Sequence, residues 1–285
     1  MPSLHLPGSL VSVDWLNENK DHCDLLILDA SWFMPAAGRD GKIEWEQAHI
    51  PGSLFFDFDR KICDLNSHLP HMMPDEEIFQ NSAQKLGINQ SSMIVVYDSL
   101  GIFTSPRVWW MLKAMGAKNV AVLDGGLPAW EAHGLAIQSG KHTHPVEPGD
   151  FVACYQHKLI CDADDVLKAT EDTEQIIIDA RSPARFLGQE AEARPGLRSG
   201  HMPNAKNLPF SEILVDTKIK DAYQLAMIFE AIAPKNNGLI FSCGSGVTAC
   251  ILALGATLAG YDNIAVYDGS WTEWGGDDSF PVVTK

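Results

Sequence analysis

Residues 238–259 read GLIFSCGSGVTACILALGATLA, and this stretch decides the fold. Its first four residues form a short apolar run begun by Gly238, which predicts a buried strand. The run from Ala249 to Ala259 is rich in Ala and Leu and predicts a helix that ends near Gly260. The sequence therefore predicts a strand, a tight loop and a helix in direct succession.

The loop between this strand and this helix holds Cys243 and two glycines, Gly244 and Gly246. Glycine permits the tight turns in which successive backbone N–H groups face one concavity. The start of a helix also favours an anion, and a cysteine placed there is stabilised as its nucleophilic thiolate. Cys243 is thus a candidate nucleophile, although the same loop also suits a small cysteine buried at a structural turn.

Length and composition bound the class of protein. A chain of 285 residues with 46% apolar and 20% charged residues is expected to form one large globular domain or two of ordinary size. The net charge of −16 argues against a nucleic-acid partner. Without an apolar run of membrane-spanning length or a secretory signal, we expect a cytoplasmic protein, no membrane partner and six reduced cysteines.

The chain contains an internal repeat. Three segments of the first half recur in the same order, at nearly constant spacing, in the second half. They are 25–30 (LLILDA) with 175–180 (QIIIDA), 49–53 (HIPGS) with 201–205 (HMPNA), and 123–130 (LDGGLPAW) with 267–274 (YDGSWTEW). We therefore expect two copies of one domain, residues 1–140 and 157–285, joined by a linker over 141–156.

Each copy alternates short apolar runs with helical patterns, which predicts an α/β fold with a mainly parallel sheet flanked by helices. The expected strands are 25–28, 93–97, 119–123, 176–178, 239–241 and 264–266, and the expected helices are 75–86, 106–115, 223–231 and 249–259. In such sheets ligands bind beyond the carboxyl ends of the strands. The loop after Phe241 lies at such an end.

The two copies differ at this loop. Aligning them places Asp98 opposite Cys243. The loop after Asp98 is longer and holds a single glycine before Pro106, so we expect it to offer neither the nucleophile nor the same compact ring of amides. The chemistry is therefore expected in the second copy.

Residues 12–281 resemble the rhodanese superfamily in its tandem-domain form. The resemblance is carried by HIPG at 49–52, SPRVWW at 105–110 and YDGSWTEWG at 267–275. Within that superfamily, CGSGVT at 243–248 looks like the active loop of the 3-mercaptopyruvate sulfurtransferases. The resemblance implies two rhodanese-like domains and a sulfurtransferase that needs no metal or organic cofactor.

The activity implied by this resemblance moves the sulfur of 3-mercaptopyruvate through a Cys243 persulfide and releases pyruvate. The acceptor would be a thiol, such as that of a thioredoxin-like protein, or cyanide. The loop residues implied to bind substrate or persulfide are Gly244, Gly246, Val247 and Thr248.

The same resemblance implies that Arg185 and Arg194 hold the carboxylate and keto oxygen of the substrate. Arginine suits this role because its planar fork donates two parallel hydrogen bonds to a carboxylate. The alternative is a pair of surface arginines that neutralise Glu190 and Glu192.

A proton relay beside the cysteine is also implied, with Ser245, His71 and Asp59 as its members. Such a relay would move a proton to or from the substrate while Cys243 takes the sulfur. For Asp59 a structural role as a cap of the next segment is an alternative.

Three other functions compete with this one. Thiosulfate:cyanide sulfurtransferases typically carry basic residues in the active loop, whereas the loop here is uncharged and favours an organic donor. Cysteine phosphatases require Cys-x5-Arg, and position 249 is Ala. A non-enzymatic persulfide relay or binding module stays open.

Overall fold

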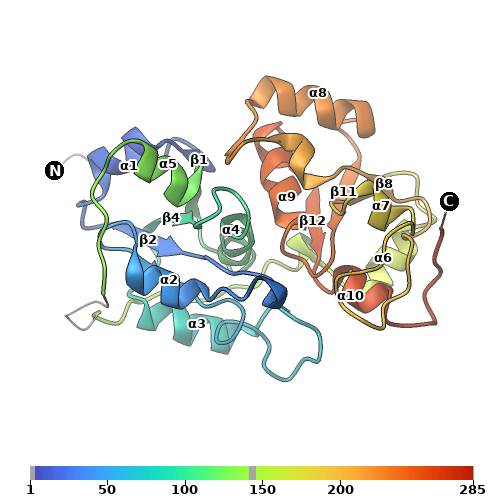
Figure 1. The fold of residues 1–285 in the computed structure, drawn as a ribbon, viewed down its shortest axis with the longest axis horizontal. Helices are drawn as coiled ribbons and strands as arrows, with labels where there is room; N and C mark the ends of the chain where they lie inside the picture. Colours follow the sequence, from blue (N-terminus) through green and yellow to red (C-terminus); the bar gives the residue numbers. More distant parts are fainter. Residues whose placement is uncertain (1–3, 141–145, 285) are drawn as a thin grey trace. The chain divides into compact units, whose positions relative to one another are not determined.

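The computed structural model describes residues 4–140 and 146–284 (Figure 1). Among these, the chain divides into two compact units. The first comprises residues 4–65, 73–140, 146–155 and 216–219, and the second comprises 66–72, 156–215 and 220–284. Each unit therefore includes a short segment that the linear repeat assigns to the other copy.

The first unit contains a five-stranded parallel sheet. Its spatial order is β1 (Leu10–Val11), β5 (Asn119–Leu123), β4 (Met93–Tyr97), β2 (Leu25–Asp29) and β3 (Leu54–Phe55). Its helices are α1 (Val13–Asn19), α2 (Gly41–Gln47), α3 (Glu76–Lys85), α4 (Ser105–Ala114) and α5 (Gly126–Ala132), with a 3-10 turn η1 (Pro35–Ala37). In Figure 1, α1 and α5 lie on one side of the sheet and α2 and α3 on the other.

The second unit repeats this arrangement with a second five-stranded parallel sheet. Its order is β6 (Ile160–Cys161), β12 (Ile264–Tyr267), β11 (Gly238–Ser242), β7 (Gln175–Asp179) and β8 (Lys206–Asn207). Its helices are α6 (Ala163–Ala169), α7 (Pro183–Phe186), α8 (Ala222–Ile232), α9 (Ala249–Leu258) and α10 (Ser270–Trp274). The remaining short elements of this unit are η2 (His157–Leu159), η3 (Phe210–Ile213) and β9 (Leu214–Val215). The strand β10 (Lys218–Ile219) lies in the segment 216–219, which belongs to the first unit.

The predicted α/β fold is confirmed, because each unit has a parallel sheet flanked by helices. The two sheets also share the same strand order, as expected for a repeated domain. The histidines of the repeated segments 49–53 and 201–205 make equivalent contacts in the two units. His49 N–H donates to Gln138 O (2.9 Å) and His201 N–H donates to Val283 O (2.8 Å), so each histidine anchors the chain that follows the last helix of its unit. The Nδ1 of each ring also bonds a backbone carbonyl. These histidines are structural.

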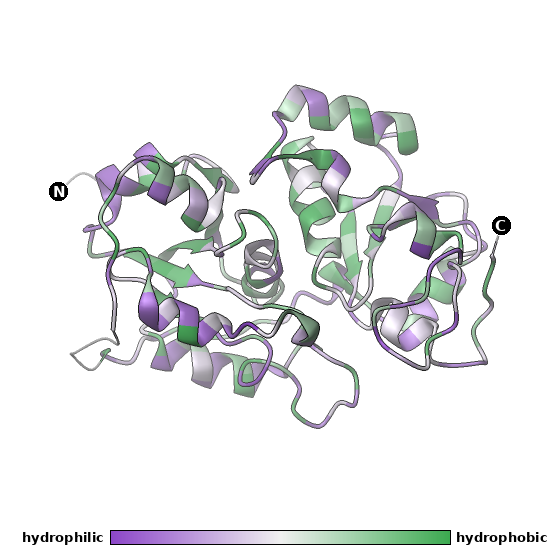
Figure 2. Cartoon of the chain, in the orientation of Figure 1, coloured by the Kyte–Doolittle hydropathy of each residue, from purple (hydrophilic) through white to green (hydrophobic). Residues whose placement is uncertain are grey.

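The central strands are apolar because both faces of each sheet are covered. In β4, Met93, Val95 and Tyr97 pack with α1 and α5, while Ile94 and Val96 point to the opposite face and are also buried. Figure 2 shows β11 and the following helix α9 as strongly hydrophobic. No helix in the described part of the chain is long and apolar enough to cross a membrane.

The second half of the predicted linker packs against the first unit. Phe151 is buried and its N–H donates to Ile88 O (3.1 Å), and Cys154 N–H donates to Met115 O (3.0 Å). Residues 141–145 of that linker lie outside the described residues. The linear boundaries at 140 and 157 remain a prediction.

Candidate active site

Cys243 lies directly after β11, at the carboxyl end of a central strand. Its side chain is buried, with 1% of the residue exposed. Residues 244–248 form an irregular loop, and helix α9 begins at Ala249. The predicted strand, loop and helix are therefore all present, and the loop lies at the amino end of a ten-residue helix.

Ser270 holds this loop in place. Its Oγ accepts hydrogen bonds from Cys243 N–H (3.2 Å) and Gly246 N–H (3.1 Å) and donates to Tyr267 O (2.8 Å). Ser270 adopts a φ of +50°, a left-handed conformation that costs free energy for a residue other than glycine. Sequence reasoning missed this residue. The signal was the repeat itself, which places Ser270 opposite Gly126.

Several amides of the loop face no acceptor in the part of the chain that the structure describes. Within the described residues, the N–H groups of Gly244, Ser245, Val247 and Thr248 donate no hydrogen bond. Such a run of open amides at the start of a helix binds an anion. The Gly246 amide is different, because it is engaged by Ser270 and serves to hold the loop.

The equivalent loop of the first unit is filled by a carboxylate. Oδ2 of Asp98 accepts from the N–H groups of Phe103, Thr104 and Ser105 (2.9, 2.9 and 2.8 Å) and from Ser105 Oγ (2.7 Å). Its Oδ1 accepts from Leu100 N–H (2.9 Å). As expected, this loop offers no nucleophile, and the amides that it does gather are used by its own carboxylate. The additional residues let the loop wrap around a side chain of its own.

Arg185 lies against the cysteine loop. It belongs to the short helix α7, and a Cβ placed on Gly244 would lie 3.2 Å from its Nη2. Nε and Nη2 of Arg185 both bond Oε2 of Glu192, the former at 3.2 Å. Its Nη1 makes no hydrogen bond within the described residues. Arg185 therefore both neutralises Glu192 and keeps one edge of its fork open.

Arg194 and His71 come together although they are far apart in the sequence. Nη2 of Arg194 lies 3.4 Å from Nε2 of His71. His71 is buried, has a φ of +63° and lies in the segment 66–72, which belongs to the second unit. Ser245, also buried, lies in the loop of the same unit. His71, Arg194 and Ser245 are thus in the unit that carries Cys243, as is Arg185.

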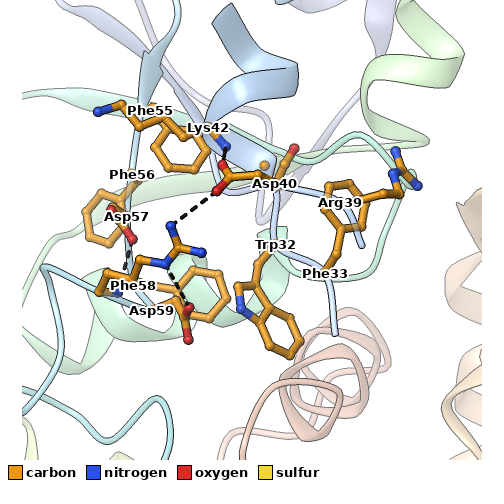
Figure 3. Close-up of a pocket in the computed structure, with 13 residues that line it drawn as sticks. Trp32, Phe33, Arg39, Asp40, Lys42, Phe55, Phe56, Asp57, Phe58 and Asp59 are labelled. Carbon is orange, nitrogen blue, oxygen red and sulfur yellow. Dashed lines mark hydrogen bonds and ion pairs between the residues drawn. The ribbon is translucent and has the colours of Figure 1, made fainter. Parts of the chain in front are cut away.

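Asp59 belongs to the first unit. Its carboxylate lies 3.8 Å from Nε of Arg60, and it lines a small cavity of about 40 Å³ together with Trp32, Asp40 and Asp57 (Figure 3). The structure therefore assigns Asp59 local contacts, and its membership of a relay with Ser245 and His71 stays a prediction.

Two other cysteines are held as thiols. Burial, with the nearby Asp59 carboxylate next in importance, raises the pKa of Cys63 to about 11. Burial likewise raises the pKa of Cys161 to about 12. Cys250 is fully buried in α9 and its Sγ donates to Gly246 O (3.2 Å), as expected for a core residue. None of these three environments suits a nucleophile.

Arg181 and Arg198 have structural roles. Arg198 donates to the carbonyls of Gly275, Trp274 and Phe280 (3.2, 2.7 and 2.9 Å) and so fixes the chain after α10. Arg181 is fully buried and bonds the carboxylate of Asp179. Neither has its fork open to a ligand.

Comparisons with known proteins agree with this architecture. The model of the rhodanese-like domain matches residues 12–133 and 162–277. Thiosulfate/3-mercaptopyruvate sulfurtransferase 1, mitochondrial, of Arabidopsis thaliana is 41% identical, over 96% of this chain and 77% of that protein. The 3-mercaptopyruvate sulfurtransferase of Escherichia coli K12 is 38% identical, over 95% of this chain and 96% of that protein.

Solved structures give the same result. The crystal structure of SseA from Escherichia coli, a 3-mercaptopyruvate sulfotransferase by its description, superposes with a TM-score of 0.84 at 36% identity. The match covers 92% of this chain and 98% of that one. The chain therefore belongs to the rhodanese-like family and carries two copies of its domain.

Proposed function

We propose that this chain is a sulfurtransferase that takes the sulfur of 3-mercaptopyruvate onto Cys243 and passes it to a thiol acceptor or cyanide. The observation that carries the proposal is the set of open amides that follows Cys243 at the start of α9. Relatives named for this activity, 38–41% identical over most of this chain, support the choice of donor.

In the first step the Cys243 thiolate attacks the sulfur of 3-mercaptopyruvate. A sulfur–sulfur bond forms and the carbon–sulfur bond breaks. The electron pair of the broken bond stays on carbon as the enolate of pyruvate, which takes up a proton. Cys243 is left as a persulfide, and pyruvate leaves.

The loop stabilises the anions of this step. The amides of Gly244, Ser245, Val247 and Thr248 are not used within the described structure, so they can donate to the thiolate and then to the outer sulfur of the persulfide. Ser270 supplies the rigidity that such preorganised donors need. The fixed loop, not a mobile side chain, does this work.

The substrate carboxylate is assigned to the arginines. Nη1 of Arg185 and the guanidinium of Arg194 are the cationic donors that the second unit offers near the loop and His71. A protonated relay through Ser245, His71 and Asp59 would deliver the proton that the enolate takes up. In the second step an acceptor thiolate, for example of a thioredoxin-like protein, attacks the outer sulfur and restores the Cys243 thiolate.

Mass spectrometry after adding 3-mercaptopyruvate tests the first step. We expect the peptide that contains Cys243 to gain one sulfur atom, with pyruvate released in equal amount. Peptides that contain the exposed Cys23 serve as the control and should gain none. A gain on Cys23 instead, or no gain on Cys243, would contradict the proposal.

Donor preference tests the choice of substrate. We expect kcat/KM to be higher for 3-mercaptopyruvate than for thiosulfate, because the loop carries no basic residue for a dianion. Replacing Arg185 by Gln should reduce the use of 3-mercaptopyruvate far more than that of thiosulfate. A preference for thiosulfate would change the donor, and a gain of sulfur only from a protein persulfide would favour a relay module.

The cytoplasmic location expected from the sequence stays a prediction. The relative from Arabidopsis thaliana at 41% identity is named as a mitochondrial protein.

A further inference from the structure

A chain of paired charges runs from the end of β7 to the edge of the cysteine loop, and three of its four members are buried at the side chain. Its members are Asp179, Arg181, Glu192 and Arg185. The side chains of Arg181 and Glu192 have exposed fractions of 0% and 2%. Nη1 of Arg181 donates to Oε1 of Glu192 (2.7 Å), and Arg185 bonds the other oxygen, Oε2. Glu192 thus bridges two arginines with its two carboxylate oxygens.

Arg181 is the rigid end of this chain. Its Nε and Nη2 donate to Asp179 Oδ2 (2.9 and 2.7 Å), Nη2 also donates to Gly200 O (2.8 Å), and its guanidinium stacks 4.1 Å from the ring centre of Trp271. Although burial disfavours its charge, the carboxylates of Asp179 and Glu192 raise the pKa of Arg181. Arg181 therefore stays charged and cannot turn away from Glu192.

Arg185 is the end that can move. It is 24% exposed at its side chain and sits on α7, a helix of four residues. Long exposed arginine side chains lose conformational freedom when they bind a ligand, and that loss weakens binding. Glu192 has already fixed Nε and Nη2 of Arg185 beside Gly244.

We infer that Glu192 is a positioning residue for substrate binding: held by Arg181, it orients the fork of Arg185 so that the Nη1 edge meets the substrate carboxylate. This inference rests on the proposed function. The buried pair of Arg181 and Asp179 is then the support that makes Glu192 rigid. The known alternative for Glu192, simple neutralisation of a surface arginine, does not require a second, buried arginine on its other oxygen.

Two substitutions separate orientation from charge. Glu192→Asp keeps the charge that buried Arg181 needs but is one methylene too short to reach both arginines. Glu192→Gln keeps the length but can accept from only one of them. Glu190→Asp is the matched control, because Glu190 is exposed and lies two residues away on the same segment.

Steady-state kinetics with 3-mercaptopyruvate gives the first readout. Glu192→Asp should raise KM about tenfold and leave kcat within about twofold, as expected when a positioned charge-assisted contact to substrate is lost. In an Arg185→Lys background the same change should alter KM less than about twofold, because coupling is lost once the fork is gone. An equal change in both backgrounds, or a loss in kcat alone, would contradict the inference.

Nuclear magnetic resonance of the arginine Nε–H groups gives a readout that does not depend on activity. The Arg185 signal is assigned by its loss in Arg185→Lys. Its exchange with solvent should be slow in the native chain and in Glu190→Asp, and at least about tenfold faster in Glu192→Asp, where the bond is lost. Unchanged exchange overturns the inference. If the native chain fails to turn over 3-mercaptopyruvate, the proposed function fails, while this exchange still decides whether Glu192 orients Arg185.

Discussion

The loops after β4 and β11 are two versions of one anion site. In the first unit the loop closes on the carboxylate of Asp98, which receives five hydrogen bonds. In the second unit the equivalent residue is Cys243, and the amides that follow it stay open. The first loop is occupied by a side chain of its own. The open amides of the second loop can bind an anion that forms during the reaction, such as the thiolate or the persulfide of Cys243.

A second difference lies opposite each loop. Gly126 has a φ of +54°, and a Cβ there would lie 2.4 Å from Asp98 O. Ser270 occupies the equivalent position with a φ of +50° and uses its hydroxyl to bind two loop amides. In the second unit a strained serine backbone thus places a hydroxyl group that holds the cysteine loop.

A third difference concerns the aspartate that ends the second strand of each repeat. Asp179 is paired with Arg181, whereas Asp29 is followed two residues later by Ser31, whose N–H donates to it (2.8 Å). Burial raises the pKa of Asp29 to about 7, and nearby Asp98 adds to this effect. The two aspartates therefore differ in their partner: Asp179 bonds the guanidinium of Arg181, whereas burial favours the protonated form of Asp29.

The largest expected effect comes from turning the second loop into a copy of the first. Cys243→Asp should abolish sulfur transfer, a loss on the order of 10³-fold or more, because the nucleophile is gone. Cys243→Ser should lose activity equally. However, the melting temperature of Cys243→Asp should be the higher of the two, because only a carboxylate fills the open amides. A lower melting temperature would show that these amides do not form an anion site.

Emptying the first loop should have the next largest effect. Asp98→Ala leaves buried donors without an acceptor and should lower the free energy of unfolding by about 4 kcal/mol or more. Denaturation in urea measures this. Asp75→Ala is the control, since it removes one capping bond, to Ile78 N–H (2.7 Å), at an exposed helix end. The control should cost about 1 kcal/mol.

Asp29 should make the stability depend on pH. Its pKa is about 7 in the folded chain against an ordinary value of 3.8, so between these values the unfolded chain releases a proton that the folded chain keeps. The stability contributed by protonated Asp29 is therefore lost as the pH rises through about 7. As the pH rises from 4 to 8, the free energy of unfolding of Asp29→Asn should increase by roughly 2 to 4 kcal/mol relative to that of the native chain.

The control for this pH dependence is Asp14→Asn, at an exposed position of α1. Its stability should follow that of the native chain at each pH. If Asp29→Asn also follows the native chain, Asp29 is ionised in the folded state at neutral pH and the contrast with Asp179 disappears.

The smallest effect concerns the serine opposite the loop. Ser270→Ala removes the hydroxyl and keeps the strain, whereas Ser270→Gly removes both, as at Gly126. Both should lower kcat about tenfold, because the loop amides lose their fixed partner. Ser270→Ala should also lower the free energy of unfolding, by about 1 kcal/mol, because the hydrogen bonds of the hydroxyl are lost, whereas in Ser270→Gly the relief of strain offsets this loss. Full activity in Ser270→Gly would show that the hydroxyl of Ser270 is not needed to hold the loop amides for catalysis.

Much of this molecule could be predicted from the sequence. The repeat and the apolar runs predicted two parallel α/β sheets, because strands buried on both faces must be continuously apolar. Strands 93–97 and 119–123 match β4 and β5 at both ends. Cys243 was predicted at the end of a strand because glycines and a helix start follow it.

Other features depend on contacts between distant residues. The linear repeat did not reveal that residues 66–72 belong to the second unit, or that Asp98 folds back into its own loop. Ser270 reaches Cys243 across 27 residues, and Arg194 reaches His71 across 123. No local pattern encodes such pairs.

The sequence by itself determined the sheets, their order of appearance and the position of the cysteine, because hydrophobic periodicity and glycine act over a few residues. Only the tertiary structure decided which loop is filled and which is open. The tertiary structure also decided that Glu192 binds two arginines, one buried and one facing the loop. Hydrogen bonds between charged groups depend on distance and direction in space, and these are properties of the folded chain.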